Sequence, residues 1–196
     1  YLSTDYVFDG NKKEPYVESD LPHPLNVYGR SKLQGEQYVQ ELVKNSLIIR
    51  TQWLYGKYGK NFVASILQQA KEKKALSIVN DQMGSPTYTV DLAKAISVLI
   101  QFDAREVFHV ANSDGCTWYA FAQAILNLSG MNEVKVIPIS SEKLDRPAVR
   151  PSYSVFNCQK LKEKTGLTLR PWPEALKDYL APYRKTIDDP DSSEGR

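Results

Sequence analysis

The first ten residues, YLSTDYVFDG (1–10), and a later stretch, YGRSKLQGE (28–36), decide how this chain is interpreted. The first stretch begins as a short apolar strand and continues into the hydroxyl side chains of Ser3 and Thr4. The second places Tyr28 and Lys32 four residues apart, so a helix would carry them on one face, one turn from each other. Both stretches predict polar chemistry beside a buried element.

Strands and helices alternate along the rest of the chain. The expected strands are 46–50, 76–79, 106–110 and 133–140, and the expected helices begin near Asn26, Asn61, Thr89, Thr117 and Pro173. In the helix after Asn26 we expect one stripe to carry Tyr28, Lys32, Gly35, Val39 and Leu42. The segments 10–24, 80–87 and 146–154 are rich in proline, glycine and polar residues and are predicted as loops. This order of elements predicts an α/β fold with a central parallel sheet covered on both faces.

The overall composition is that of a globular chain of 196 residues, with 42% hydrophobic and 24% charged side chains. The formal net charge is only +2, which argues against a nucleic-acid partner because no strong positive field is present. The longest apolar runs are far shorter than the roughly 20 residues that a membrane-spanning helix needs. We therefore expect no nucleic acid and no membrane among the partners.

The two cysteines, Cys116 and Cys158, are far apart and have no histidine near them in sequence. Their spacing indicates neither a disulfide framework nor a zinc site, and no acidic cluster has the spacing of metal ligands. His109 falls in an expected strand and is interpreted as a core side chain. A reducing, cytoplasmic location and the absence of a metal are the expectations.

A tyrosine beside a lysine on one helix face has a chemical use. A nearby ammonium favours the ionised phenol and brings its pKa toward neutrality, so Tyr28 would act as a general acid or base. Ligands of open α/β sheets bind beyond the carboxyl ends of the strands, where Ser3 and Thr4 lie. Because side chains alternate along a strand, only one of these hydroxyls is expected to serve, and spacing does not choose between them.

Five motifs in one order make the chain resemble a known family. The motifs are STDYVFDG (3–10), PLNVYGRSKLQGE (24–36), IIRTQWLYG (48–56), NDQMGSPT (80–87) and RPAVRP (146–151). From Tyr1 to about Tyr183 the chain resembles the extended short-chain dehydrogenase/reductase superfamily, and within it the family of dTDP-4-dehydrorhamnose reductases. The resemblance implies the C-terminal part of a Rossmann-like doubly wound sheet with a small substrate-binding lobe.

The resemblance also implies roles for particular residues. Tyr28 would donate the proton, and Lys32 would bind the nicotinamide ribose and tune the tyrosine. The family's hydroxyl residue matches Thr4, which would hold the substrate oxygen. Asp5, Tyr6 and Trp53 would position the sugar, although Trp53 is equally consistent with packing. Arg150, and less so Arg146, could meet a pyrophosphate through the planar guanidinium fork.

The implied reaction is the NADPH- or NADH-dependent reduction of the C4 ketone of dTDP-4-dehydro-L-rhamnose to dTDP-L-rhamnose, in deoxysugar nucleotide and surface polysaccharide biosynthesis. Tyr6 stands where the related 4,6-dehydratases carry glutamate, which disfavours a dehydratase. Another sugar-nucleotide epimerase or reductase stays open, and so does a non-catalytic regulatory subunit resembling the methionine adenosyltransferase β-subunit. The expected partner is a nucleotide sugar, with a homodimer as one option.

The resemblance divides the chain into three parts. Residues 1–75 would complete a dinucleotide-binding domain and carry the catalytic helix. Residues 76–187 would form the substrate lobe, interleaved with the last Rossmann elements, and 188–196 are expected to be a disordered tail. The glycine-rich turn that cradles a pyrophosphate has no match here, and the resemblance places it upstream, in about a hundred further residues. We therefore interpret the 196 residues as a fragment that is inactive alone.

A dinucleotide titration tests this interpretation. The isolated 196 residues are expected to bind NADPH poorly, because the backbone N–H groups that would hold the pyrophosphate are missing. Isothermal calorimetry or NADPH fluorescence measures the affinity. Tight, stoichiometric binding would contradict the expectation.

Overall fold

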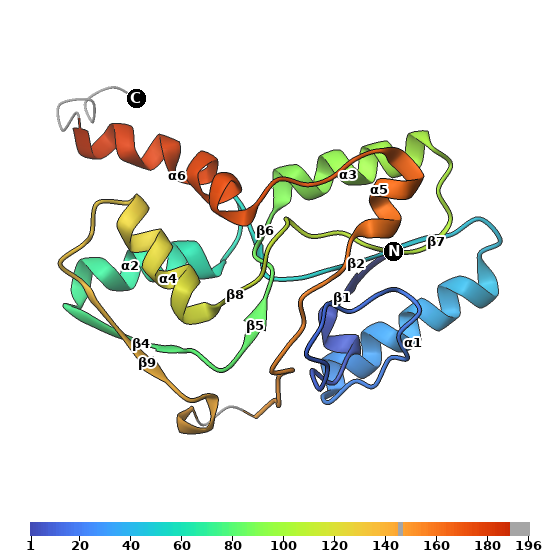
Figure 1. Ribbon diagram of the computed structural model, residues 1–196, viewed down its shortest axis with the longest axis horizontal. Helices are drawn as coiled ribbons and strands as arrows, with labels where there is room; N and C mark the ends of the chain where they lie inside the picture. Colours follow the sequence, from blue (N-terminus) through green and yellow to red (C-terminus); the bar gives the residue numbers. More distant parts are fainter. Residues whose placement is uncertain (145–146, 189–196) are drawn as a thin grey trace.

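The computed structural model describes residues 1–144 and 147–188 (Figure 1). Its strands are β1 (Leu2–Thr4), β2 (Leu47–Thr51), β3 (Leu54–Tyr55), β4 (Ala75–Val79), β5 (Met83–Gly84), β6 (Thr87–Tyr88), β7 (Glu106–His109), β8 (Cys116–Thr117) and β9 (Lys135–Ile139). Its α-helices are α1 (Val27–Leu42), α2 (Phe62–Glu72), α3 (Thr89–Gln101), α4 (Trp118–Leu128), α5 (Gln159–Thr165) and α6 (Trp172–Asp188). Two short 3₁₀ turns are η1 (Asp5–Val7) and η2 (Ser141–Lys143).

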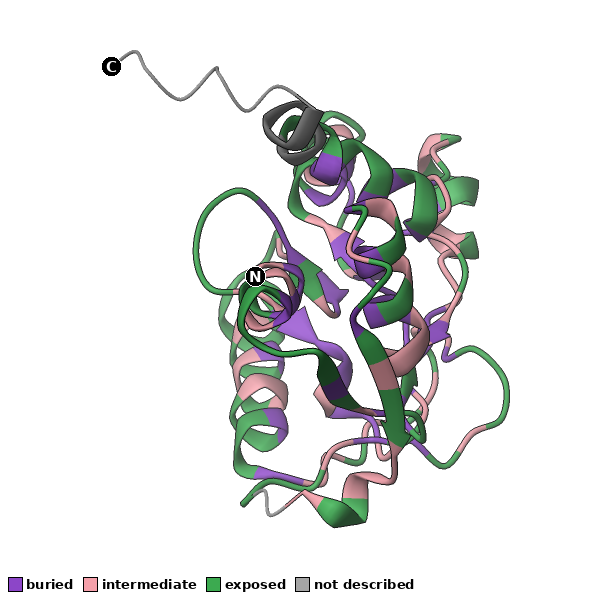
Figure 2. Ribbon diagram, turned by 90° about the vertical axis from the view of Figure 1, so that its left-hand side faces the viewer, coloured by how far each residue is buried: buried purple, intermediate pink, exposed green. Residues whose placement is uncertain are grey.

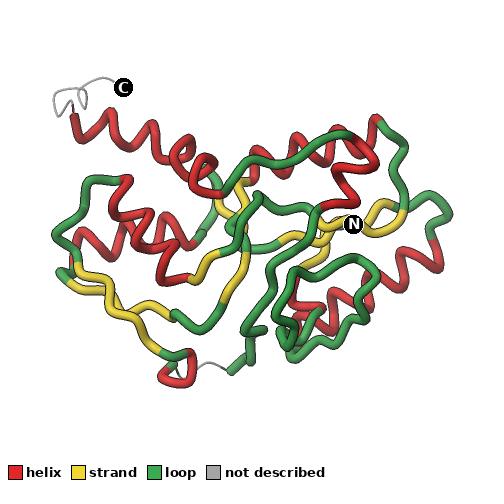
Figure 3. The backbone as a smooth tube through the Cα atoms, viewed as in Figure 1, coloured by secondary structure: helices red, strands yellow, loops and turns green. Residues whose placement is uncertain are grey.

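A three-stranded parallel sheet in the order β1-β2-β7 forms the first half of the molecule. Helix α1 lies on one face of this sheet, and α3 and α5 lie on the other (Figures 1 and 3). The strands are buried while the outward sides of the helices are exposed (Figure 2). This arrangement confirms the predicted α/β fold, and the carboxyl ends of β1 and β2 meet at one edge, where ligands of such sheets bind.

Helix α1 begins where the sequence predicts. The Asn26 side chain accepts a hydrogen bond from the Gly29 amide at 2.8 Å, which satisfies a free N–H of the first turn. The predicted stripe is only partly right, because Leu42 is 79% exposed. The buried residues of the helix are Gly29 and Glu36.

Glu36 is buried because it pairs with Arg50 of β2. The Arg50 Nε lies 2.9 Å from Glu36 Oε1, and Nη2 lies 2.6 Å from Oε2, with both side chains almost fully enclosed. A charge can be buried when it is paired and hydrogen-bonded in this bidentate way. The pair attaches α1 to the sheet.

The second half of the molecule has its own apolar core. Helices α2, α4 and α6 and the parallel pair β4–β9 contribute to one cluster, whose fully buried members include Phe121, Ile66 and Leu180. The predicted boundary at residue 75 stays a prediction. Helix α2, which precedes it, contributes Val63, Ile66 and Ala70 to this second core.

Three details differ from the sequence predictions. The segment 80–87 is not only loop, because it contains β5 and the first residue of β6, which pair with β8 and β3. Thr89 is the first residue of α3 and not its cap; the cap position is Tyr88, which makes no side-chain capping bond. Helix α5 was not expected at all. Such short elements form through contacts with distant segments, which local patterns do not encode.

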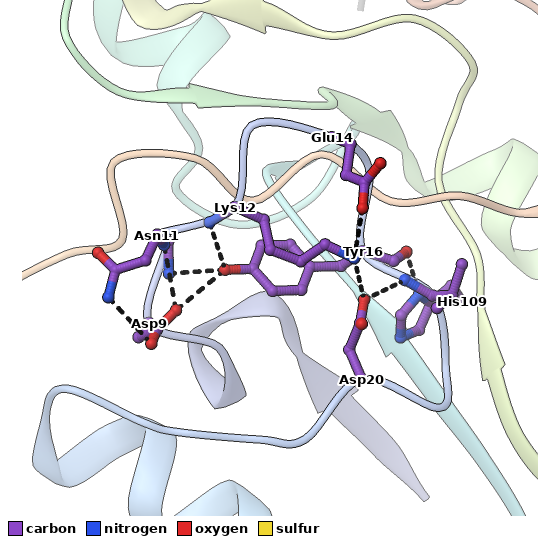
Figure 4. Close-up of polar contacts among 9 residues, drawn as sticks. Asp9, Asn11, Lys12, Glu14, Tyr16, Asp20 and His109 are labelled. Atoms are coloured by element: carbon purple, nitrogen blue, oxygen red, sulfur yellow. Dashed lines mark hydrogen bonds and ion pairs between the residues drawn. The ribbon is translucent and has the colours of Figure 1, made fainter.

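The long loop after η1 is held by the Tyr16 side chain (Figure 4). Its hydroxyl accepts hydrogen bonds from the Gly10 and Lys12 amides and donates one to Asp9. The Tyr16 backbone in turn pairs with Val155 and Asn157. Through these hydrogen bonds the loop holds residues 152–157, which are far away in the sequence, beside the end of β1.

No helix among residues 1–144 and 147–188 is both long and apolar enough to cross a membrane. Arg146 and residues 189–196 of the predicted tail lie outside the described residues. Helix α6 extends to Asp188.

Two glycine substitutions on α1 test how closely this helix packs. A Cβ at Gly29 would overlap the backbone oxygen of Tyr6, which cannot rotate away. Gly29→Ala is therefore expected to lower the free energy of unfolding by about 1–3 kcal/mol. Denaturant unfolding followed by circular dichroism measures the change.

Gly35→Ala is the matched control on the same helix. Its new Cβ would meet only the end of the Tyr1 side chain, which can rotate, while alanine improves helix propensity by about 1 kcal/mol. We expect this variant to be at least as stable as the wild type. Equal stability of both variants would show that α1 does not press on Tyr6.

Candidate active site

A cleft of about 710 Å³ lies at the carboxyl ends of β1 and β2. Four segments line it: the β1 end with η1, the start of α1, the residues after β2, and the loop 147–150. The predicted site residues in its lining are Thr4, Asp5, Tyr6, Tyr28, Trp53 and Arg150. The structure thus brings together six of the seven residues predicted from the sequence.

Tyr28 and Thr4 share this cleft. Tyr28 is 54% exposed and its ring meets the edge of Tyr6, with 5.5 Å between the ring centres. Thr4 is buried, and its hydroxyl accepts a hydrogen bond from the Tyr6 amide at 3.3 Å. A half-exposed tyrosine and a buried strand-end threonine therefore line one cleft, the arrangement that proton transfer to a bound ligand requires.

Lys32 follows Tyr28 by one turn of α1 but is not part of the cleft lining. Its ammonium lies 4.2 Å above the ring centre of Tyr1. No carboxylate among the described residues forms an ion pair with it. The charge is thus held over the Tyr1 ring, outside the cleft lining, and keeps its hydrogen-bonding capacity.

The two hydroxyls of the opening strand differ in their surroundings. Both Ser3 and Thr4 contribute to the cleft wall, and the expectation that only one of their hydroxyls serves stays a prediction. The Ser3 hydroxyl oxygen is enclosed and has no hydrogen-bond partner in the described part of the chain. Thr4 is thus the strand-end residue whose hydroxyl takes part in the polar network of the site.

Asp5 is only 2% exposed, and both of its carboxyl oxygens are occupied. Thr4 donates to Oδ1 at 3.1 Å, and Ser154 donates to Oδ2 at 2.7 Å. Burial raises the pKa of Asp5 to about 6, while the hydrogen bonds from Ser154 and Thr4 and the charge of Arg150 act in the opposite direction. A carboxyl at the cleft wall therefore changes charge within the physiological pH range.

Sequence reasoning missed Ser154 and Gln52. The Gln52 amide donates to the Ser154 backbone oxygen at 2.9 Å and accepts from the Ser85 amide at 2.9 Å. Ser154 itself lies in a segment predicted as loop, 149 residues from Asp5 in the chain. No local pattern marks these residues; only the burial of a carboxylate, which must be hydrogen-bonded, could have suggested that a partner exists.

Trp53 packs against other aromatic residues and also lines the cleft, so its expected contact with a sugar stays a prediction. Its ring stacks on Trp118, with 3.4 Å between ring centres and 7° between planes, and its indole touches Gly84. Its backbone φ is +46°, an unfavourable conformation for a side chain of this size. Packing against the second apolar core therefore holds Trp53 at the cleft wall in a backbone conformation that costs free energy.

Arg150 lies where two cavities meet. It lines the main cleft and a second cavity of about 370 Å³, which Lys60, Trp118 and the start of α2 also border. Its guanidinium forms no ion pair with a carboxylate in the described residues. Arg150 is therefore available to a ligand that extends from one cavity to the other.

His109 is a core residue, as predicted. It is fully buried, its Nδ1 lies 3.1 Å from the Tyr16 carbonyl oxygen, and its ring stacks on Phe156. Burial, followed by the charge of Arg50, lowers its pKa to about 3, so it is neutral. Within the described ranges, no group of three or more potential metal-ligating side chains is present.

Comparisons with known proteins identify relatives of this chain. The spore coat polysaccharide biosynthesis protein SpsK of Bacillus subtilis is 43% identical over 188 residues, which cover 96% of this chain and 65% of that protein. A dTDP-4-dehydrorhamnose reductase of Sinorhizobium fredii is 39% identical, with 90% of this chain and 63% of that protein covered. The chain thus spans a little under two thirds of the length of these relatives.

Solved structures give the same result. The crystal structure of a Bacillus anthracis dTDP-4-dehydrorhamnose reductase in complex with NADP superposes with a TM-score of 0.90 at 43% identity. The match covers 93% of this chain and 64% of that one. Residues 1–185 match the family described as the RmlD substrate binding domain, and the chain belongs to this family.

Proposed function

We propose that the protein is an NAD(P)H-dependent reductase that converts the C4 ketone of dTDP-4-dehydro-L-rhamnose into a hydroxyl group. The observation that carries the proposal is the single cleft at the strand ends, which is lined by both Tyr28 and Thr4. The sequence identities of 39% and 43% with two dTDP-4-dehydrorhamnose reductases support the choice of substrate.

The residues present suit one end of a nicotinamide dinucleotide. Tyr28 is exposed in the cleft, and Lys32, one turn further along α1, has no carboxylate partner among the described residues. These two side chains would hold the nicotinamide ribose through its hydroxyl groups. The bound reduced nicotinamide supplies the hydride for the reduction.

Tyr28 would supply the proton. Reduction of a ketone places negative charge on its oxygen, and a phenol donating at that atom neutralises it. The Lys32 ammonium would favour loss of the phenol proton by electrostatic attraction. Thr4, on the opposite wall, would orient the same oxygen by a hydrogen bond.

The nucleotide part of the substrate would extend along the wall that carries Arg150. A guanidinium without a protein carboxylate partner is suited to a pyrophosphate, which it binds with two parallel hydrogen bonds. Tyr6 and Trp53, both in the cleft lining, would contact the sugar. Asp5 is enclosed by protein donors, so we propose that it acts on the sugar through its neighbours.

The proposal includes a cytoplasmic location and a homodimer. The two cysteines are not disulfide-bonded, and burial raises the pKa of both thiols, which favours their protonated form. Light scattering of the purified full-length protein measures its oligomeric state.

Substitution of Tyr28 tests the catalytic proposal. Tyr28→Phe removes the proton donor and should lower kcat by about 10²- to 10⁴-fold, the usual contribution of a general acid. The measurement is the loss of NADPH absorbance when the full-length protein is given dTDP-4-dehydro-L-rhamnose.

Tyr38→Phe is the matched control, because Tyr38 is on the same helix, is similarly exposed and does not line the cleft. It should leave kcat unchanged. Absence of NADPH oxidation by the wild type would favour the non-catalytic regulatory alternative, and release of a C3 or C5 epimer without NADPH use would favour the epimerase.

Substitution of Arg150 tests the proposed pyrophosphate contact. Arg150→Met should raise KM for the nucleotide sugar by about 10- to 100-fold, since a charged hydrogen-bond donor is lost. Arg150→Lys should restore only part of the affinity, because a point charge cannot form the bidentate contact. Arg105→Met, an exposed arginine outside the cleft, is the control. An unchanged KM in Arg150→Met contradicts the contact.

A further inference from the structure

We propose that Asp5 is a positioning residue that acts through Thr4. Its carboxyl group decides whether the Thr4 hydroxyl proton points at Asp5 or into the cleft, and Ser154 fixes which carboxyl oxygen faces Thr4. The consequence for activity rests on the reductase proposal, whereas the proton arrangement can be tested without it.

The hydrogen bonds of Thr4 determine what its hydroxyl can offer to a ligand in the cleft. A threonine hydroxyl has one proton to donate and two lone pairs that accept. One lone pair takes the Tyr6 amide proton at 3.3 Å, and the hydroxyl proton goes to Asp5 Oδ1 at 3.1 Å. With an ionised Asp5, Thr4 therefore has only a lone pair to offer the cleft.

A ketone oxygen, and the alkoxide that it becomes, accept hydrogen bonds and cannot donate them. Thr4 can stabilise either one only if its proton leaves Asp5. Protonation of Asp5 on Oδ1 permits this, because the carboxylic acid then donates to Thr4 Oγ1 and the threonine proton turns toward the cleft. The neutral carboxyl thus makes Thr4 a hydrogen-bond donor to the substrate.

Ser154 directs the proton of Asp5 to the correct oxygen. Its hydroxyl donates to Oδ2 at 2.7 Å, which makes Oδ2 an acceptor and leaves Oδ1, beside Thr4, for protonation. The serine is held in place by its backbone, whose oxygen accepts from Gln52 and whose amide donates to the Met83 carbonyl at 2.8 Å. The arrangement is therefore directional.

The charged and titratable groups around Asp5 are few. Arg150 comes from the C-terminal segment, Tyr28 and Arg30 from α1, and Tyr6 from η1. Asp5 is the only carboxylate in the lining of the cleft in the described residues. Burial raises its pKa to about 6, so both charge states are populated near neutral pH.

A carboxyl titration tests the proton arrangement directly. In the full-length protein with ¹³C-labelled aspartate, the resonance that disappears in Asp5→Asn should titrate near pH 6. Thr4→Val and Ser154→Ala should each raise this midpoint, because each removes a hydrogen bond that stabilises the ionised form.

Ser152→Ala is the matched control for the titration. This serine is in the same segment, but its hydroxyl donates to the Gly10 carbonyl and not to Asp5. Its midpoint should equal that of the wild type. A midpoint near 3.8 in the wild type, or one that Thr4→Val does not move, would overturn the proposal.

The pH dependence of kcat tests the consequence. Between about pH 5.5 and 7.5 the wild-type rate should fall by up to about 25-fold, the factor by which the protonated fraction of a group with a midpoint near 6 declines. Asp5→Asn should abolish this dependence, because its amide can donate permanently to Thr4. In Ser154→Ala the fall in kcat should occur at higher pH, and the shift should equal the shift of the Asp5 titration midpoint in the same variant.

The two measurements separate two kinds of failure. The positioning role is overturned if kcat of Asp5→Asn still falls with pH. It is also overturned if the fall in kcat of Ser154→Ala does not shift with the Asp5 titration midpoint of that variant. In both cases the reductase proposal stands. If no ketone reduction is seen at any pH, the reductase proposal fails, and the carboxyl titration alone still decides the coupling of Asp5, Thr4 and Ser154. Enzyme-free blanks correct for loss of NADPH in acid.

Discussion

The site depends on one constraint, which is that a carboxyl group buried at the end of β1 must be hydrogen-bonded. Asp5 obtains one donor from its neighbour Thr4, and the other comes from Ser154, far along the chain. A buried acceptor left without a partner costs about 1–3 kcal/mol, and more when it is charged. This requirement ties Ser154 to the end of β1, and the residues just before Ser154 place Arg150 in the wall of the same cleft.

Other contacts hold the segment around Ser154 in place. Gln52, which follows β2, and Met83 of the short strand β5 form hydrogen bonds with the backbone of Ser154. The backbone of Tyr16 forms hydrogen bonds with Val155 and Asn157. The stacking of Trp53 on Trp118 connects the cleft to the second apolar core, against which both rings pack. A substrate spanning both cavities would therefore contact residues that are far apart in the sequence, from Ser3 to Arg150.

Local signals predicted the regular elements well where the determinant is itself local. Helices begin after Asn26 and Asn61 as expected, each capped by that asparagine, and the run Leu47–Thr51 forms the central strand. The signal failed for Leu42, which ends a helix without reaching the core, because the buried face of α1 is set by Arg50 and by the close approach of Gly29 to Tyr6. These are tertiary contacts, and helical spacing alone cannot reveal them.

The sequence by itself determined the alternation of strands and helices, the pairing of Tyr28 with Lys32 on one helix, and the hydroxyls at the strand end. These follow from periodicity and spacing over a few residues. Only the tertiary structure decided that Ser3 is enclosed while Thr4 joins a polar network, that burial raises the pKa of Asp5, and that Ser154 is its partner. The physical reason is that desolvation and hydrogen bonding depend on which distant segments exclude water from a group, and that is a property of the packed chain.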